Sequence, residues 1–318
     1  MNLSEMLKYQ GVDEVPVDFE AFWQREKEAI LNIEPNIRLQ ENTNRKFKGF
    51  QCYDLWFEGL NSSNIHAKCV RPTFLETKKQ LPIVLLFHGY GGNSGNYYDK
   101  LAFASQGFFV VSMDARGQYG TSNDKSIYNG MTQTGFVARG LIDYEPQKLY
   151  FHHLFTDTIQ LLHALKQLDF VDVTNTYVFG GSMGGALATV AAALNSEYVK
   201  KAFILEPFLC DIKRIAIDSQ IPSVYADVRD FIRTYAQSNA EQEKMWQTLS
   251  YIDVKNFGRY IKAKVKFYVG LNDVTCYPIT QFALYNKINS DKELKTYVNY
   301  GHEDLPGAVD EAIMFFND

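Results

Sequence analysis

Short continuous runs of apolar residues recur along most of this chain. They read PIVLLFH (residues 82–88), FFVVSM (108–113), TYVFG (176–180), AFILE (202–206) and VKFYVG (265–270). Strands that are buried on both faces have this composition, as in a parallel sheet that helices cover. The pattern therefore predicts a mostly parallel central sheet.

Segments with helical spacing separate these runs. Residues 151–168 place apolar side chains near helical spacing, and residues 183–194 (MGGALATVAAAL) form a run of small residues that can pack tightly on a sheet. A final helix is expected around residues 305–316. Alternating strands and helices are typical of a doubly wound α/β architecture. We therefore predict one α/β domain over residues 1–318, with helices flanking the sheet.

Two segments depart from this alternation. Residues 18–31 predict a helix with Asp18 as its N-cap, and residues 47–71 alternate apolar and polar positions as antiparallel strands do. We therefore assign residues 1–75 to an N-terminal extension of one helix and antiparallel strands. Residues 210–250 are long, charged and helix-rich, which favours a helical cap insertion over the functional site rather than a simple crossover.

Composition and charge exclude several classes of function. The chain has 318 residues, of which 46% are hydrophobic, and its formal net charge is −5. A chain with this many apolar residues can bury a large core, so the class of intrinsically disordered proteins is excluded. The acidic balance argues against a nucleic-acid partner. The sequence has no polybasic run and no apolar stretch of the ~18 residues that a membrane helix needs, so no membrane partner is expected.

The cysteines indicate a compartment and argue against a metal. Cys52, Cys69, Cys210 and Cys276 are scattered and form no C-x-x-C pair. Such spacing gives no zinc site, and four cysteines are too few for a disulfide scaffold. The opening residues MNLSEMLKYQ lack the apolar segment of a secretory signal. We therefore expect reduced thiols, a cytoplasmic location and no metal.

Candidate chemistry begins at residues 180–184, which read Gly-Gly-Ser-Met-Gly. This G-x-S-x-G sequence follows the predicted strand TYVFG and opens the small-residue helix, which is the context of a nucleophile elbow. The glycines let neighbouring backbone approach the turn, and the helix N-terminus supplies unpaired N–H groups. Ser182 is therefore the candidate nucleophile; the alternative is a glycine-rich turn with an incidental serine.

A serine hydroxyl needs a histidine base, and the base needs an orienting carboxylate. His302 is the only histidine downstream of Ser182, and it follows the strand-like LKTYV. Asp273 comes just after VKFYVG, at the carboxyl end of a predicted strand where functional groups gather. The order Ser, Asp, His is that of α/β-hydrolases. Asp273 can also be read as an Asx-turn residue, and Asp253 and Glu206 remain alternative acids.

A tetrahedral oxyanion requires two N–H donors. One should come from Met183, the residue after the nucleophile. The other should come from the glycine-rich turn HGYGG (residues 88–92) after the first buried run, with Tyr90 as the candidate donor. His88 precedes Ser182 in the chain, so we interpret it as a structural residue that holds this turn.

Three elements in this order resemble a known family. They are Arg116-Gly117-Gln118, the elbow GGSMGG (residues 180–185) and His302-Glu303. Together they resemble the signature set of carbohydrate esterase family seven, the acetyl xylan esterases and cephalosporin C deacetylases of the α/β-hydrolase superfamily. The similarity runs through most of the chain, from Tyr9-Gln10-Gly11 to Leu249-Ser250-Tyr251.

The resemblance implies deacetylation of small acetyl esters, including acetylated xylo-oligosaccharides and cephalosporin C-like esters, through an acetyl-serine intermediate. It implies no metal or cofactor and a homohexamer with its sites facing an inner chamber. It also implies that the catalytic triad is Ser182, Asp273 and His302 and that Tyr90 and Met183 form the oxyanion hole. Arg116, Gln118 and Glu303 are implied to be structural supports near the site.

The chain departs from the family at two places. Met183 stands where members usually carry Gln after the serine, which changes a pocket wall but not the backbone donor. Cys276-Tyr277-Pro278 replaces the usual Cys-Pro-Pro after the acid, which puts that loop in doubt. The alternatives to a deacetylase are a broad-range carboxylesterase or peptidase on the same fold, or a catalytically silent binding protein.

The chain is rich in aromatic residues, with 3 Trp, 20 Tyr and 23 Phe. Most belong to the core, but several lie close in sequence to the candidate chemistry, where a sugar-ester pocket would use their faces and hydroxyls. These are Tyr90, Tyr119, Phe208, Tyr277 and Tyr300.

Overall fold

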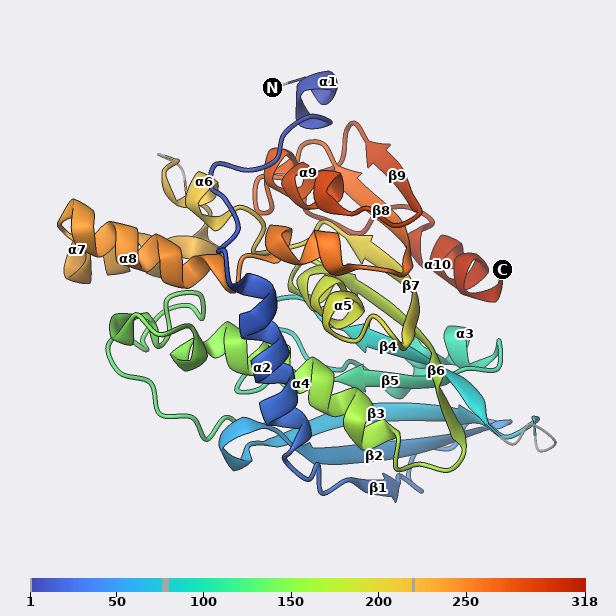
Figure 1. Cartoon of the computed structure of the whole chain (residues 1–318). Helices are drawn as coiled ribbons and strands as arrows, with labels where there is room; N and C mark the ends of the chain where they lie inside the picture. The colour runs from blue at the N-terminus through green and yellow to red at the C-terminus, as the bar shows by residue number, and fades with distance from the viewer. Residues whose placement is uncertain (1, 76–79, 219–220) are drawn as a thin grey trace.

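A single twisted sheet organises the computed structural model, which describes residues 2–75, 80–218 and 221–318. Over these residues the sheet has nine strands in the spatial order β1-β2-β3-β5-β4-β6-β7-β8-β9 (Figure 1). Their bounds are Arg38–Glu41 (β1), Phe50–Glu58 (β2), Asn64–Pro72 (β3), Leu81–Phe87 (β4), Phe109–Met113 (β5), Val171–Gly181 (β6), Val199–Leu205 (β7), Lys264–Gly270 (β8) and Lys292–Tyr297 (β9).

The sheet divides into two parts by strand direction. Neighbouring strands from β5 through β4, β6, β7 and β8 to β9 are all parallel. The pairs β1–β2, β2–β3 and β3–β5 are antiparallel. Each of the five continuous apolar runs lies in a parallel strand, which confirms the predicted mostly parallel sheet. The antiparallel pair expected in residues 47–71 is β2 and β3, and the short edge strand β1 was not predicted.

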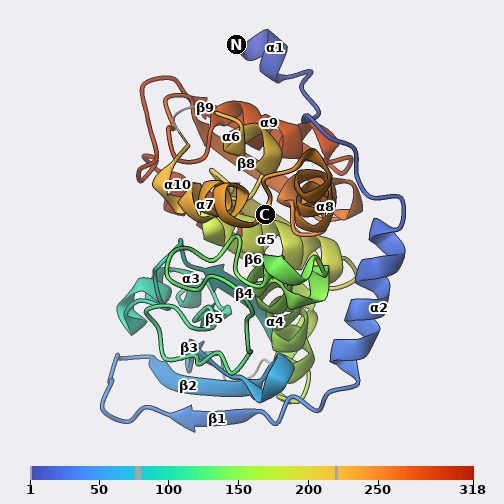
Figure 2. The same cartoon turned by 90° about the vertical axis from the view of Figure 1, so that its left-hand side faces the viewer.

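Helices cover both faces of the sheet. On one face lie α2 (Phe19–Leu31), α4 (Tyr150–Leu165), α5 (Met183–Leu194) and α9 (Pro278–Lys287), which share one apolar cluster with the strands. On the other face lie α3 (Leu101–Ala104) and α10 (Ala308–Asn317), which pack in a second cluster. Figure 1 shows α2 and α4 in front of the sheet, and Figure 2 shows α3 and α10 on the side of the sheet opposite to α2. This arrangement confirms the predicted α/β-hydrolase class of fold.

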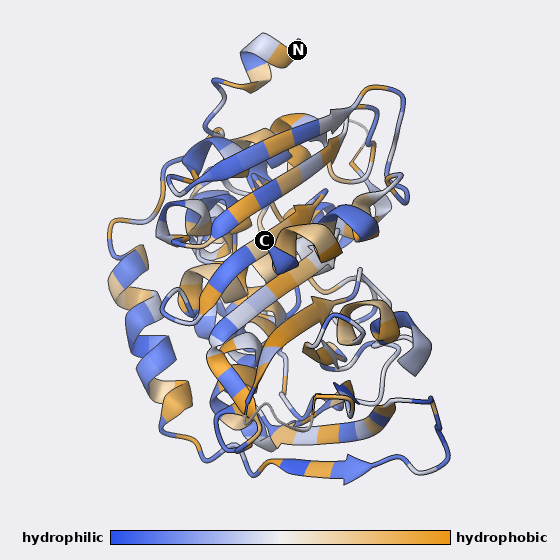
Figure 3. Ribbon diagram, turned by 90° about the vertical axis from the view of Figure 1, so that its right-hand side faces the viewer, coloured by the Kyte–Doolittle hydropathy of each residue, from blue (hydrophilic) through white to orange (hydrophobic). Residues whose placement is uncertain are grey.

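Burial follows the apolar pattern of the strands. Every residue of β5 is buried, whereas the edge strands β1 and β9 contain no fully buried residue. In Figure 3 the strands in the middle of the sheet are correspondingly more apolar than the two edges. Among the described residues, no helix combines the length and the apolar character that a membrane crossing requires.

The N-terminal extension wraps around the sheet. The short helix α1 (Leu3–Met6) stands apart from the body, and the chain then runs to α2 (Figure 1). Asn286 Nδ2 donates to the carbonyl oxygens of Met6 and Tyr9 and so anchors this segment. Asp18 occupies the N-cap position of α2, but its side chain caps no backbone N–H. Instead it accepts a hydrogen bond from the Tyr251 hydroxyl, which corrects the predicted capping role.

Residues 210–250 contain three of the helices: α6 (Ile212–Ala216), α7 (Ala226–Tyr235) and α8 (Asn239–Ser250). Residues 219–220 within this segment lie outside the described residues. Figure 1 places α7 and α8 beyond one end of the sheet, and Figure 2 looks onto them from that side. Asp227 of α7 accepts a hydrogen bond from the backbone N–H of Ala138, which joins this segment to the long loop after β5. We propose that α6, α7 and α8 form the cap insertion.

Short 3₁₀ helices complete the described elements. They span Leu60–Ser62 (η1), Tyr97–Lys100 (η2), Leu141–Asp143 (η3), Pro146–Lys148 (η4), Ser223–Tyr225 (η5) and Val254–Tyr260 (η6). The last of these packs between α5 and α9 and so supports the helix that follows Ser182.

Candidate active site

Ser182 forms a sharp turn between β6 and α5. Its backbone has φ 58° and ψ −122°, a conformation that costs an L residue free energy and that surrounding packing must impose. The packing is tight: a Cβ added to Gly180 would lie 2.1 Å from the Gly184 carbonyl oxygen, and one added to Gly184 would lie 2.0 Å from that of Phe87. Only glycine fits at these two positions, so the G-x-S-x-G spacing lets the serine turn pack against the end of β4.

The structure brings Ser182, His302 and Asp273 together from three separate loops. His302 Nε2 lies 3.0 Å from Ser182 Oγ, and His302 Nδ1 lies 2.8 Å from Asp273 Oδ2. The Asp273 side chain is fully buried, whereas 26% of the His302 side chain is exposed. The three residues therefore have the contacts of a nucleophile, its base and an orienting acid, with the base open to one side.

Asp273 makes the contacts of both interpretations that the sequence left open, an Asx-type turn and a carboxylate that faces the histidine. Its Oδ1 accepts hydrogen bonds from the backbone N–H groups of Thr275 and Cys276, which is an Asx-type turn. Its Oδ2 contacts His302 and also accepts a hydrogen bond from Gln281 Nε2 at 3.2 Å. One oxygen thus fixes the loop while the other faces the imidazole. Gln281 lies in α9, and no signal in the sequence predicted its contact with Asp273.

Two opposing effects set the pKa of His302. Burial disfavours the charged imidazole, but the hydrogen bond and the charge of Asp273 favour it, and together they raise the pKa above the usual 6.5. Glu206 adds to this increase in the same direction. The imidazole is therefore a stronger base than free histidine, which suits proton transfer from a hydroxyl.

The two alternative acids lie in different places. Asp253 is buried beside Lys255, whose ammonium lies 2.7 Å from Asp253 Oδ2, so it serves an ion pair remote from His302. Glu206, by contrast, has an oxygen 3.6 Å from His302 Nδ1. The structure thus places Glu206 beside the candidate site together with Asp273.

The glycine-rich turn after β4 lies directly against the serine. A Cβ added at Gly89 would lie 3.9 Å from the Ser182 Cβ atom. His88 holds this turn, because its Nδ1 contacts the Gly89 carbonyl oxygen at 2.8 Å and its Nε2 accepts a hydrogen bond from the Ala115 backbone at 2.9 Å. Burial lowers the pKa of His88, in keeping with a neutral ring. Gly89 thus places the turn that contains Tyr90, the first candidate oxyanion donor, beside Ser182. Met183, the second candidate donor, directly follows the serine at the start of α5.

Gln118 connects the two candidate donor segments. Its Oε1 accepts a hydrogen bond from the Gly91 backbone N–H at 2.8 Å. Its Nε2 donates to the Tyr150 hydroxyl at 2.8 Å and contacts Met183 Sδ at 3.2 Å. One side chain therefore holds the turn that contains Tyr90 in register with the start of α5.

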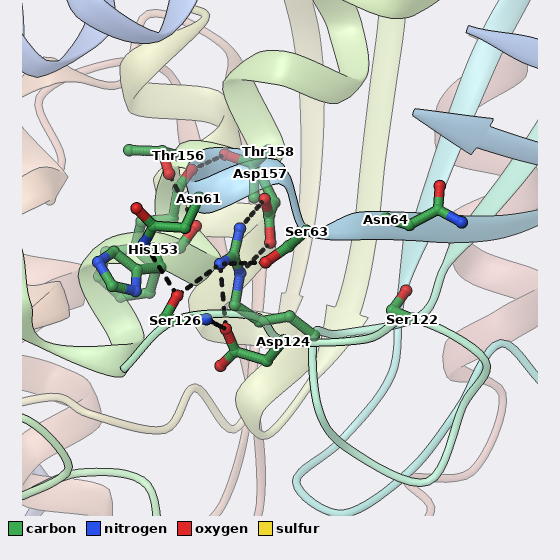
Figure 4. A network of polar contacts seen from close by, with 12 residues as sticks. Asn61, Ser63, Asn64, Ser122, Asp124, Ser126, His153, Thr156, Asp157 and Thr158 are labelled. Carbon is green, nitrogen blue, oxygen red and sulfur yellow. Dashed lines mark hydrogen bonds and ion pairs between the residues drawn. The ribbon is translucent and has the colours of Figure 1, made fainter. Parts of the chain in front are cut away.

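Arg116 is fully buried and forms a bidentate ion pair. Its Nη2 lies 2.6 Å from Asp157 Oδ1, and its Nε lies 2.7 Å from Asp157 Oδ2. Its Nη1 also has longer contacts, each of 3.4 Å, with Ser63, Asp124 and Ser126. Figure 4 shows these four partners around one point between β3, α4 and the loop after β5. The Tyr150 hydroxyl donates to the Arg116 carbonyl oxygen, and this hydrogen bond fixes the backbone that leads to Gln118.

A cleft of about 630 Å³ opens beside Ser182 and His302 and runs along the start of α10. Its lining contains four carboxyl groups and, among the described residues, no Lys or Arg; the four are Glu206, Glu303, Asp304 and Asp310. Glu303 also accepts a hydrogen bond from the Gly301 backbone at 3.0 Å, next to His302. The cleft therefore presents negative charge to a ligand.

The aromatic residues expected around the pocket do not line this cleft. Phe208 is 1% exposed and packs against Tyr90, so both rings belong to the core rather than to an open wall. Tyr119 is exposed, but it does not belong to the lining. Among the described lining residues, Phe179 is the one Phe, Tyr or Trp. Phe208 contributes through its backbone, whose N–H donates to the Ser182 carbonyl oxygen at 3.0 Å.

A second histidine also lies between carboxylates. His66 Nδ1 lies 2.7 Å from Asp114 Oδ2, and its Nε2 lies 2.9 Å from Asp54 Oδ1. The residue is 2% exposed, and its backbone N–H donates to Ser122 Oγ. Asp114 further accepts backbone hydrogen bonds from Ser94 and Thr121, so this cluster joins β2, β3 and the loops after β4 and β5.

Two groups of described residues bring three possible metal ligands within 4.8 Å of one another. In Asp13, Asp211 and Asp253 the ammonium of Lys255 already lies between the carboxylates. The other group contains Asp273, His302 and Cys276, and burial raises the pKa of the Cys276 thiol, which disfavours the thiolate that binds metals.

Comparisons with known proteins identify relatives of this chain. The model of the family "Acetyl xylan esterase (AXE1)" matches residues 1–318. The structure of acetyl xylan esterase 1 from Thermoanaerobacterium sp. JW/SL YS485 superposes with a TM-score of 0.94 and 37% identity, over 100% of this chain and 98% of that one. An acetyl xylan esterase from Paenibacillus sp. R4 has a TM-score of 0.93 and 31% identity, over 99% of both chains.

A curated relative is more distant. The acetyl esterase Axe7A of Xylanibacter ruminicola is 26% identical over 285 residues, which cover 87% of this chain. The match spans 61% of the length of that relative. This chain therefore corresponds to a part of that longer relative.

Proposed function

Because this chain belongs to the acetyl xylan esterase family, we propose that it is a serine esterase that removes acetyl groups from small esters. One observation carries the proposal: His302 contacts Ser182 Oγ at 3.0 Å and Asp273 Oδ2 at 2.8 Å, at the mouth of an open cleft. Acetylated carbohydrates are the substrate class that the family favours. Apart from the substrate and water, the proposed reaction uses only side chains and backbone groups of this chain.

The mechanism follows from these contacts. His302 Nε2 takes the proton of the Ser182 hydroxyl as its oxygen attacks the acetyl carbonyl carbon. The alcohol then leaves with the proton from His302, and an acetyl-serine remains. Water repeats the sequence, with His302 again as base, and acetate is released. Asp273 keeps Nδ1 of the imidazole oriented and stabilises the imidazolium that forms twice in each cycle.

The oxyanion is stabilised by the backbone N–H groups of Tyr90 and Met183. The turn that contains Tyr90 lies against Ser182, and Met183 begins the helix behind it. Two N–H donors directed at the developing charge contribute about 3 kcal/mol each to the barrier reduction. Because both donors are backbone groups, Met183 in place of the usual Gln leaves the oxyanion hole intact. Gln118 and Arg116 support these segments without reacting.

The charge of the cleft narrows the substrate class. Glu303, Asp304 and Asp310 are exposed at its lining, and no described Lys or Arg lies among them. A neutral acetylated sugar meets no repulsion there, whereas an ester that carries a carboxylate, as cephalosporin C does, is repelled. We therefore propose neutral acetylated oligosaccharides as the better substrates and cephalosporin C-like esters as poorer ones.

Hydrolysis of p-nitrophenyl esters tests the proposed function. The acetate should be hydrolysed far faster than the octanoate, and Ser182→Ala should remove nearly all activity, while the matched control Ser196→Ala should retain it. Equal rates on acetate and octanoate would favour a broad-range carboxylesterase. Activity that survives in Ser182→Ala would contradict the mechanism, and an inactive wild type would favour a silent binding protein.

We also propose that the chain assembles as a homohexamer. Figure 1 shows the short helix α1 projecting from the body. Leu3, Leu7, Val12 and Val17 of the N-terminal segment are exposed apolar residues that another copy would cover. Light scattering after size exclusion should give six times the chain mass of 36.4 kDa. A monomeric mass at micromolar concentration would contradict this assembly.

A cytoplasmic location is proposed on the state of the cysteines. Cys52, Cys69, Cys210 and Cys276 are all free and buried. Buried free thiols are typical of a reducing compartment. Thiol titration of the denatured protein without reductant should find four free groups, and recovery in an exported fraction of the native cell would contradict the proposal.

A further inference from the structure

Glu206 adopts a strained backbone at the end of β7. Its φ is 41°, in the left-handed region that a residue with a long side chain seldom occupies. The residue is 5% exposed and lies in the lining of the active-site cleft. Strained positions of this kind persist where the surrounding structure imposes them, and they cluster at functional sites. The side chain of Glu206 is therefore a candidate for a functional role in the cleft.

The side chain of Glu206 links the end of β8 to the catalytic base. Its Oε1 accepts a hydrogen bond from the Gly270 backbone N–H at 3.2 Å. Its Oε2 lies 3.6 Å from Nδ1 of His302, the same ring nitrogen that contacts Asp273 at 2.8 Å. A Cβ at position 270 would lie 2.5 Å from Glu206 Oε1, so glycine makes room for this carboxyl. Two carboxyl groups thus face one nitrogen, one within hydrogen-bond distance and one just outside it.

The surroundings of Glu206 favour its protonated form. Burial and the negative charge of Asp273 raise the pKa of Glu206 to about 8, against the opposing effect of His302 and the Gly270 hydrogen bond, while Glu303 adds a small further increase. At neutral pH the Glu206 carboxyl therefore keeps its proton. Without the charge of Asp273, one of the two main causes disappears and Glu206 ionises more readily.

We propose that Glu206 is a second positioning carboxyl for His302, which assists Asp273 in the intact site and replaces it when the charge of Asp273 is lost. This inference rests on the proposed function, since it needs His302 to be the base. The replacement requires only that Oε2 close the small gap to Nδ1. Glu206 then accepts the Nδ1–H hydrogen bond, holds the tautomer with a free Nε2 and stabilises the imidazolium.

A double-mutant cycle tests this role. We would measure kcat/KM for p-nitrophenyl acetate in wild type, Glu206→Gln, Asp273→Asn and the double variant, with thermal unfolding of each. Glu206→Gln alone should cost about threefold, whereas in the Asp273→Asn background it should cost a further twentyfold or more. A residue that only braces the fold would cost the same factor in both backgrounds, and equal factors would overturn the proposal.

Two further variants keep the test decisive. Glu303→Gln removes a neighbouring carboxylate that makes no ion pair with Nδ1, and it should cost the same factor in both backgrounds. Should Glu206→Gln fail to fold, Glu206→Asp in the Asp273→Asn background should show an intermediate loss, because it keeps the acid but shortens its reach; no loss there would also overturn the proposal. Activity retained in Ser182→Ala would overturn the proposed function instead, so the two failures differ.

Discussion

His302 and His66 each contact two carboxyl groups, but the carboxyl groups are arranged differently around the two rings. Both partners of His302, Asp273 and Glu206, face Nδ1, which leaves Nε2 for the Ser182 hydroxyl. His66 has one partner on each nitrogen, Asp114 on Nδ1 and Asp54 on Nε2. The side chain of His302 is 26% exposed, whereas that of His66 is 3% exposed.

We propose that this difference separates a catalytic site from a structural one. Both clusters contain a histidine, carboxylates and a nearby serine, so residue types alone do not distinguish them. His66 has no nitrogen left to accept a proton from a hydroxyl, and its Ser122 accepts a backbone hydrogen bond instead. His302 keeps one nitrogen for Ser182 and an open side for a substrate. Access and the free ring nitrogen therefore assign the chemistry.

The largest expected effect comes from replacing each histidine in turn. His302→Asn should lower kcat/KM by about 10⁴-fold or more, because the serine loses its base, while the unfolding temperature changes little. His66→Asn should lower the unfolding temperature and leave kcat/KM of the folded protein within about threefold. Esterase assays on both variants, with calorimetry, check this contrast. Comparable losses of activity in the two variants would contradict the distinction between His302 and His66.

The structural cluster should matter most for stability. Asp114 accepts hydrogen bonds from His66, Thr121 and Ser94, which overcome the opposing effect of burial and hold its pKa well below the usual value. Asp114→Asn breaks a buried pair and should reduce the free energy of unfolding by about 3 kcal/mol. Urea unfolding near neutral pH measures this loss. A change below about 0.5 kcal/mol would show that the His66 cluster contributes little.

The pH dependence of activity sharpens the catalytic side of the comparison. Only the neutral imidazole of His302 can accept the serine proton, and Asp273 raises the pKa of His302 above 6.5. As pH falls through this raised value, kcat/KM should therefore decrease about tenfold per unit, beginning above pH 6.5. A profile of kcat/KM against pH shows the midpoint. An acidic limb centred below pH 6 would contradict the contact with Asp273.

The smallest expected effect concerns the charge of the substrate. A neutral acetyl ester should have a kcat/KM about fivefold higher than an anionic ester of the same size, because three exposed carboxylates line the cleft. The ratio should fall in 0.5 M salt and in Asp310→Asn. If an anionic ester is hydrolysed equally well at low salt, the cleft carboxylates do not determine substrate preference.

The sequence predicted those parts of the fold that depend on local pattern. The continuous apolar runs identified the parallel strands, and the glycines around Ser182 identified the elbow, because each signal lies within a few adjacent residues. The order of Ser182, Asp273 and His302 predicted a site that the structure assembles. The family resemblance added the expected oligomer and substrates, which the fold of one chain does not address.

Contacts between distant segments could not be predicted in the same way. Gln281 reaches Asp273 from a helix that has weak amphipathic character, and Asp157 pairs with Arg116 across 41 residues. The sequence indicates Glu206 as one of two alternative acids, yet its carboxyl lies beside the imidazole together with that of Asp273. Of the aromatic residues near the motifs, Phe208 faces the core and Tyr119 is exposed outside the cleft lining, since position along the chain does not fix which way a side chain faces.

The most direct test of the central claim is covalent labelling of the nucleophile. Intact-mass analysis after treatment with a fluorophosphonate should show one adduct per chain, and peptide mapping should place it on Ser182. Ser182→Ala should carry no adduct, and His302→Asn should be labelled very slowly. His66→Asn should be labelled at the rate of the wild type. An adduct on another serine, or rapid labelling of His302→Asn, would contradict the assignment of Ser182 and His302 as nucleophile and base.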